Sequence, residues 1–264
     1  MRGMWRRAVW LASVLATGGS LAASDLLDAS RSAISGGRPL PAIHGLTMTG
    51  RLRLTAERDA MLDGTVEIQI ELPRRYTRID TIGSTRRISG FDRDQVLTSG
   101  PGRPAERLRD ERAKLARLML GIAAAVVTDE HVEMQFAGDE AFPDTRAVDL
   151  TTKSWSLRYV MDKATSMPMR IVFFGGSRGT TITSFADRRD VDGYQLPHRI
   201  TTTTSERVLE TLMFDEILVK TEGRKAHDVH HAHASHIHKC LPDPRACCEC
   251  VFAALPRSER PAAG

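Results

Sequence analysis

The chain has 264 residues, of which 41% are hydrophobic and 27% are charged, and its formal net charge is +4 at pH 7. This length is enough for one large β domain or two small domains with a substantial buried core. The charge balance is not typical of a nucleic-acid-binding protein, and no basic stripe interleaved with aromatic residues is present. We therefore expect no nucleic-acid partner.

Residues 1–23 have the order of features that a signal peptidase recognises. Arg2, Arg6 and Arg7 precede a short apolar stretch over residues 8–16, and small residues lead to a predicted cleavage site after Ala23. The apolar stretch is too short to span a bilayer, which takes about 20 apolar residues. We predict a periplasmic or secreted protein exported through this signal, and an uncleaved membrane anchor is the alternative.

The region after the signal begins with a helix and continues as a series of strands. Residues 24–34 are predicted to form a short amphipathic helix, with Ser24 as its cap and Gly36 and Gly37 after its end. From Leu46 onward, apolar and polar residues alternate, which is typical of strands with one buried and one wet face. This alternation and the turn residues between the runs predict strands over residues 46–54, 66–72, 75–82, 85–91, 131–137, 145–151, 155–161, 168–175, 179–188, 197–204 and 206–218.

One long helix, over residues 104–125, is predicted to interrupt the strands. Pro104 suits a first helical turn. The apolar stripe of the helix consists of Leu108, Leu115, Leu118, Met119 and Ile122. Its other face carries the mixed-sign residues Arg107, Arg109, Asp110, Glu111, Lys114 and Arg117, which we interpret as a solvated face. Many antiparallel strands with few helices predict a mainly β fold built on one strongly curved sheet.

The composition changes abruptly after Lys220. We predict three regions: a signal peptide over 1–23, a β domain over 24–220, and a tail over 221–264 whose prolines and polar residues disfavour packed structure. The candidate metal ligands of the tail are His227, His230, His231, His233, His236, His238, Cys240, Cys247, Cys248 and Cys250. Such imidazole and thiolate groups suit zinc, copper or nickel. Disulfide formation, disorder and a non-functional extension or reading-frame artefact are the open alternatives.

Four short stretches of the β domain carry a resemblance to a known family. They are AIHGLTMTG at 42–50, ELPRRY at 71–76, GFD at 90–92 and DVDGYQLPHRI at 190–200, of which the last is the most specific. Over residues 33–197 the chain resembles the LolA-like family of outer-membrane lipoprotein-sorting and related periplasmic proteins. The resemblance implies an unclosed barrel of about eleven antiparallel strands with helices over its open concave face.

The same resemblance implies a function. We predict a carrier that holds acyl chains of a lipid or lipidated protein in an apolar concave cavity, has no enzymatic activity or cofactor, and touches the membrane only transiently. The cavity candidates are Leu46, Met48, Leu52, Val66, Ile68, Ile70, Leu115, Met119, Trp155, Leu157, Tyr159 and Met161. These residues could instead be ordinary core. A structural envelope component with a protein partner, and a hydrolase whose site is assembled from distant residues, are the alternative functions.

Overall fold

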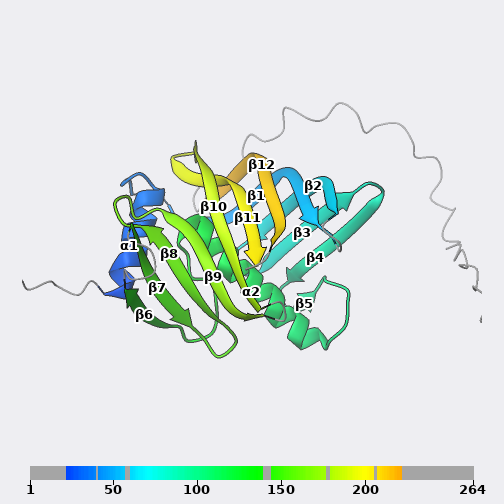
Figure 1. Cartoon of the computed structure of the whole chain (residues 1–264), viewed down its shortest axis with the longest axis horizontal. Coiled ribbons are helices and arrows are strands. Elements are labelled where there is room, and N and C mark those ends of the chain that lie inside the picture. The colour runs from blue at the N-terminus through cyan, green and yellow to red at the C-terminus, as the bar shows by residue number, and fades with distance from the viewer. Residues whose placement is uncertain are drawn as a thin grey trace, which may run out of the picture. The chain divides into compact units, whose positions relative to one another are not determined.

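The computed structural model describes residues 22–39, 41–56, 60–138, 144–176, 179–204 and 207–221. The predicted signal peptide up to residue 21 lies outside the described residues, as does the tail from residue 222 with all its candidate metal ligands. The described chain contains two helices and a twelve-stranded antiparallel sheet whose two edge strands do not pair (Figure 1). The predicted fold class, mainly β with an unclosed barrel, is therefore confirmed.

The elements agree closely with the sequence prediction. In chain order they are α1 (Ala23–Ile34), β1 (Ile43–Thr55), β2 (Met61–Glu71), β3 (Arg75–Ile82), β4 (Thr85–Asp92), β5 (Gln95–Val96), α2 (Pro104–Ala123), β6 (Glu133–Gly138), β7 (Thr145–Thr151), β8 (Ser156–Asp162), β9 (Pro168–Gly176), β10 (Gly179–Val191), β11 (Tyr194–Thr204) and β12 (Val208–Thr221). Only β5 lacks a predicted counterpart, because two residues are too few to show alternation. Ser24 is not the cap of α1. That position is Ala22, whose backbone N–H donates to Asp25.

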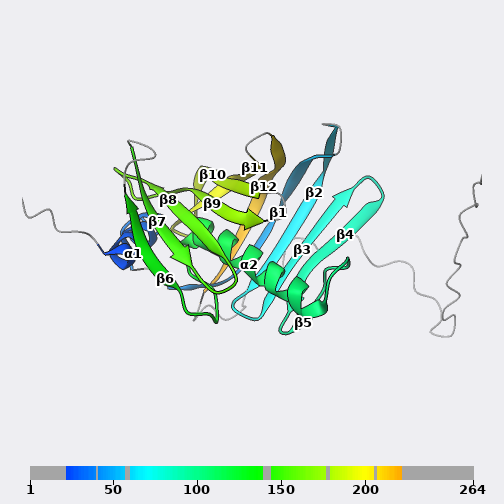
Figure 2. The ribbon, with the colours of Figure 1, turned by 60° about the horizontal axis from the view of Figure 1, so that its bottom comes forward.

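The strand order explains the position of α2. The sheet runs β5-β4-β3-β2-β1-β12-β11-β10-β9-β8-β7-β6, so β1 pairs with both β2 and β12, and β5 and β6 form the opposite edges. Since α2 connects β5 to β6, it must cross from one edge of the sheet to the other. Figure 2 shows α2 crossing between the two halves of the curved sheet.

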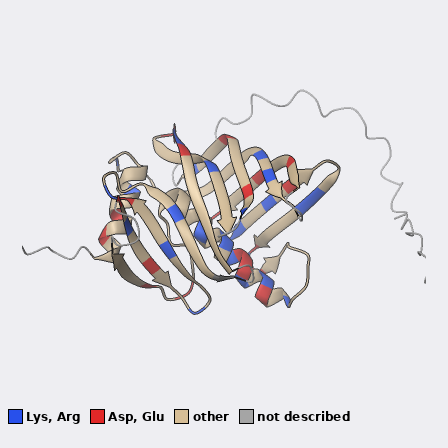
Figure 3. Ribbon diagram, in the orientation of Figure 1, with Lys and Arg blue, Asp and Glu red and all other residues tan. Residues whose placement is uncertain are grey.

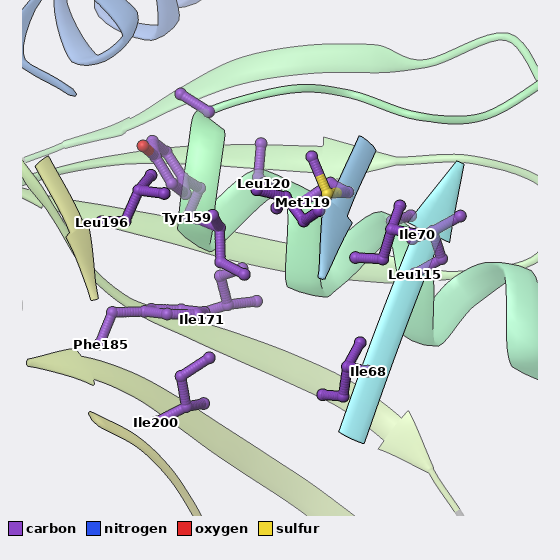
Figure 4. Packing of buried hydrophobic residues seen from close by; sticks show 14 of the residues in the cluster. Ile68, Ile70, Leu115, Met119, Leu120, Tyr159, Ile171, Phe185, Leu196 and Ile200 are labelled. Atoms are coloured by element: carbon purple, nitrogen blue, oxygen red, sulfur yellow. The ribbon is translucent and has the colours of Figure 1, made fainter. Parts of the chain in front are cut away.

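The core lies between the curved sheet and the helices. Alternate residues of β1 and β2 are buried, with Leu46, Met48 and Ile68 each at most 1% exposed. Figure 4 shows side chains from β2 and from the β8–β11 half of the sheet converging on α2. The helix α1 is attached to β8 by a buried hydrogen bond of 2.5 Å between the hydroxyl groups of Ser30 and Tyr159.

The prediction that the charged face of α2 is solvated is wrong for Glu111 and Arg117. Glu111 is 1% exposed, and its carboxylate accepts hydrogen bonds from Thr98 Oγ1 and Lys114 Nζ, both at 2.7 Å. Arg117 is half-buried, and its guanidinium carbon lies 4.2 Å from the ring centroid of Phe173. The reason is that α2 lies inside a curved sheet. The surrounding protein therefore covers part of the charged face of the helix as well as its apolar stripe. Figure 3 shows the charges of both signs along α2 beside the strands.

Candidate functional site

Two cavities lie on different sides of α2. The first, which we call the Trp155 cavity, has a volume of about 1190 Å³, slightly above the roughly 300–1,000 Å³ that is typical of ligand sites. Its apolar lining consists of Ile43, Leu72, Pro73, Phe91, Ala105, Leu108, Ala113, Leu115, Val126, Val127 and Trp155. Its polar lining consists of His44, Arg74, Arg93, Asp94, Arg109, Arg112, Thr128, Asp129, Glu130 and Ser154.

Several polar residues of the Trp155 cavity are hydrogen-bonded to one another. Arg112 on α2 donates to Asp94 at 2.9 Å and to Asp129 at 3.2 Å, which joins the helix to two loops. Glu130 accepts hydrogen bonds from the hydroxyl and the backbone N–H of Ser154, and these bonds lower the pKa of its carboxyl group. These four charged residues are therefore already paired or hydrogen-bonded within the protein.

Trp155 is held in place by the turn that precedes β8. Its backbone N–H donates to Thr152 Oγ1 at 3.1 Å, and its carbonyl oxygen accepts from the backbone N–H of Thr152 at 2.8 Å. The side chain is 9% exposed and lines the cavity. The indole therefore presents part of its apolar surface to the cavity from a turn whose backbone is held by hydrogen bonds.

The second cavity, which we call the Arg117 cavity, has a volume of about 1310 Å³ and lies between α2 and strands from both halves of the sheet. Its apolar lining consists of Leu54, Ala56, Leu62, Ile68, Tyr76, Ile82, Ile88, Leu118, Phe173, Ile200, Leu209 and Leu212. Its polar lining consists of Thr55, Arg78, Asp80, Arg87, Ser89, Thr98, Ser99, Lys114, Arg117, Thr181, Thr183, Thr202, Thr204, Arg207 and Glu210. This cavity is thus the more polar of the two.

An ion pair spans the floor of the Arg117 cavity. Arg78 Nη2 lies 2.7 Å from Glu210 Oε2, and Arg78 Nε lies 2.8 Å from Asp80 Oδ1. Arg78 belongs to β3 and Glu210 to β12, which are separated in the sheet by β2 and β1. Only a strongly curved sheet brings these strands within reach of one another. Burial raises the pKa of Glu210, but the charge and hydrogen bond of Arg78, together with Thr202 and Lys114, lower it by more in sum. The net pKa therefore lies below its ordinary value.

The predicted cavity residues divide between the cavities and the core. Trp155 and Leu115 line the Trp155 cavity, and Ile68 lines the Arg117 cavity. The other candidates line neither of these cavities and lie in the core, each at most 2% exposed: Leu46, Met48, Leu52, Val66, Ile70, Met119, Leu157, Tyr159 and Met161. Their contact with a ligand stays a prediction.

The candidate site residues predicted from the sequence include none of the polar side chains that line the Arg117 cavity. Arg117 stands in a mixed-sign helical run, and Arg78 and Glu210 are 132 positions apart, so no local pattern connects them. Within the described ranges, no group of three or more His, Cys, Asp or Glu residues could hold a metal ion. No helix among the described residues is long and apolar enough to cross a membrane.

Of the comparisons with known proteins, the structural comparison gave matches, whereas the two sequence comparisons did not. No protein-family model matches the sequence, and no curated protein matches it. Similar solved structures include a LolA superfamily protein from Nitrosomonas europaea, with a TM-score of 0.52 and 11% identity over 76% of this chain and 94% of that chain. They also include a putative outer membrane lipoprotein-sorting protein domain from Vibrio parahaemolyticus, with a TM-score of 0.47 and 12% identity over 76% of this chain and 94% of that chain. A DUF1329 family protein from Desulfovibrio piger has a TM-score of 0.49 and 8% identity over 77% of this chain and 93% of that chain. The first of these likenesses shows that the described domain has the fold of a LolA superfamily protein.

Proposed function

We propose that the protein is a periplasmic or secreted carrier that binds the acyl part of a lipid or a lipidated protein. The observation that carries this proposal is the apolar lining of the Trp155 cavity, where Phe91, Leu108, Val127 and Trp155 surround a volume of about 1190 Å³. The fold shared with a LolA superfamily protein supports the same proposal. Export rests on the predicted signal peptide over residues 1–23.

The energetics of acyl binding are favourable in principle. Burial of an acyl chain contributes about 0.8 kcal/mol per CH₂, so that a chain of about 16 carbons gains on the order of 12 kcal/mol before costs. Lost translational and rotational freedom consumes roughly 4 kcal/mol or more of this gain. The remainder allows micromolar or tighter affinity if most of the chain is buried.

Trp155 provides a direct test of this proposal. The chain contains three tryptophans, so replacing Trp5 and Trp10 with Phe leaves Trp155 as the only one. Titration with hexadecanoate should then change the emission of Trp155 saturably, because the indole lines the proposed acyl site. An independent measurement of hexadecanoate binding, by equilibrium dialysis, accompanies the titration.

Two matched leucine variants locate the site. Leu108 lines the Trp155 cavity, whereas Leu97 is 39% exposed and lines neither cavity. Leu108→Gln should weaken binding by roughly tenfold or more, since it removes about 1.5–3 kcal/mol of apolar contact, and Leu97→Gln should leave binding unchanged. Leu157 is unsuitable for this purpose because it is 1% exposed and its replacement would perturb the core.

Three results would count against the proposal. Binding without any change in Trp155 emission would place the ligand elsewhere. An equal effect of both leucine variants would show a general loss of stability instead of a lost contact. If no acyl ligand binds, the carrier function fails and the structural envelope component becomes the better hypothesis.

A further inference from the structure

The guanidinium of Arg117 has an unusual environment for a cation. It is half-buried and stacked on the ring of Phe173, with 4.2 Å between its central carbon and the ring centroid. No carboxylate of the described chain lies within ion-pair distance of it. Burial lowers the pKa of Arg117. A charge removed from water in this way is costly unless another group compensates it.

The other buried or bonded cations beside Arg117 already have carboxylate partners. Arg78 is paired with Glu210 and Asp80, and Lys114 is paired with Glu111. The lining of the Arg117 cavity contains five Arg and Lys side chains but only two carboxylates, those of Asp80 and Glu210. The cavity lining therefore has an excess of positive charge. Of its two arginines that are not exposed, Arg78 and Arg117, only Arg117 has no carboxylate of the described chain within ion-pair distance.

The stacking geometry suits an anionic ligand. The guanidinium carbon lies over the Phe173 ring, and the guanidinium N–H groups have no hydrogen-bond partner among the described residues. These groups can therefore bind phosphate or carboxylate oxygens in a bidentate manner. The ring also restricts the side chain, so that less conformational freedom is lost on binding. An apolar surface adjoins this cationic centre in the same cavity, formed by Leu54, Leu62, Ile68, Ile82, Leu118 and Leu212.

We propose that the Arg117 cavity binds the anionic group of an amphiphile, a phosphate ester or a carboxylate, with Arg117 as its principal contact and the alkyl chain on the apolar surface of the same cavity. The evidence for the anion site is the geometry around Arg117. The lipid character of its ligand rests on the proposed carrier function. Arg117 is thus a specificity-determining residue that selects anionic over neutral ligands.

The test compares three soluble probes on the full chain by isothermal titration calorimetry. The probes are octyl phosphate, octan-1-ol and inorganic phosphate. The variant is Arg117→Gln, and its matched control is Arg86→Gln, which removes an equal charge from an exposed position of β4 that lines neither cavity. Thermal melting of each variant checks the fold.

Octyl phosphate should bind the parent at least roughly tenfold more tightly than octan-1-ol, which is the scale of a charge-assisted hydrogen bond. Arg117→Gln should abolish this difference, and Arg86→Gln should retain it. Equal affinity for octyl phosphate and octan-1-ol in the parent, or an unchanged preference in Arg117→Gln, overturns the anion site. If inorganic phosphate binds as tightly as octyl phosphate, the proposal of an amphiphilic ligand is wrong and the ligand is a free anion. None of these results alters the Trp155 titration, so failure of the anion site and failure of the carrier function are separable.

Discussion

Gly121 of α2 lies directly against the ring of Phe185 on β10, and it allows a stringent test of the docking of this helix. A Cβ atom at Gly121 would lie 1.8 Å from Cζ of Phe185 and 2.4 Å from its Cε1. Phe185 is only 6% exposed, so its ring has little room to move. We therefore expect Gly121→Ala to separate α2 from β10 and to destabilise the fold.

The expected magnitude is the difference between two opposing effects. Alanine favours a helix over glycine by at most about 1 kcal/mol, whereas overpacking in a core costs typically about 1–3 kcal/mol and occasionally more. A contact far shorter than van der Waals distance belongs at the upper end, which leaves a net loss of about 1–2 kcal/mol. For a domain of this size, this corresponds to a fall of roughly 2–8 °C in the melting temperature.

Differential scanning calorimetry of Gly121→Ala, Phe185→Leu and the double variant completes a double-mutant cycle. The double variant should lose less than the sum of the two single losses, because the smaller leucine leaves space for the alanine methyl group. A Gly121→Ala protein that melts at or above the parent temperature would refute the reasoning. In that case the helical preference of alanine would be the only effect, and α2 would not rest on Phe185.

Two further predictions concern contacts between distant elements. In Arg78→Gln the carboxylate of Glu210 loses its partner, and we expect a loss of about 1–3 kcal/mol at neutral pH, below the value for a fully buried pair because both side chains are partly exposed. Since the pKa of Glu210 is held below its ordinary value of 4.5, its contribution is complete above that pH and is lost as the pH falls through the lowered value. The urea midpoint of the parent should therefore fall more steeply than that of Arg78→Gln on acidification below pH 4.5, and equal slopes would contradict the pairing. Ser30→Ala leaves the hydroxyl of Tyr159 buried without its partner, which should cost about 1–3 kcal/mol in urea unfolding. Adding Tyr159→Phe to Ser30→Ala should recover part of that loss, and no recovery would argue against the hydrogen bond.

Much of the fold is encoded locally. Alternation such as that of Leu46, Met48 and Leu52 gives the position of a strand and its buried face, because side chains point to opposite sides with a period of two. The 3.6-residue period likewise places Leu115 and Met119 on the buried face of α2. Such periods depend only on neighbouring residues, so the sequence alone was sufficient to predict every strand except β5.

The candidate site was predicted only in part. Trp155, Leu115 and Ile68 are the predicted residues that line a cavity, since an apolar residue on a buried face is a candidate for any cavity beneath that face. Alternation cannot separate these residues from Tyr159 or Met161, which have the same pattern but are fully enclosed by core. Whether a buried face meets a helix or an empty volume depends on the element packed against it, and a strand's own sequence does not contain that information.

Tertiary structure alone decided the charged part of the molecule. The sequence places Glu111 and Arg117 on the polar side of a helix, which would face water if that helix lay on an outer surface. The order of the strands makes α2 cross between opposite edges of a curved sheet, and this crossing encloses both residues. The same curvature brings Arg78 of β3 to Glu210 of β12 across two intervening strands. The sequence thus determined which residues form each strand and helix, whereas the curvature of the whole sheet, which arises from the summed twist of its strands, determined which charges are buried together.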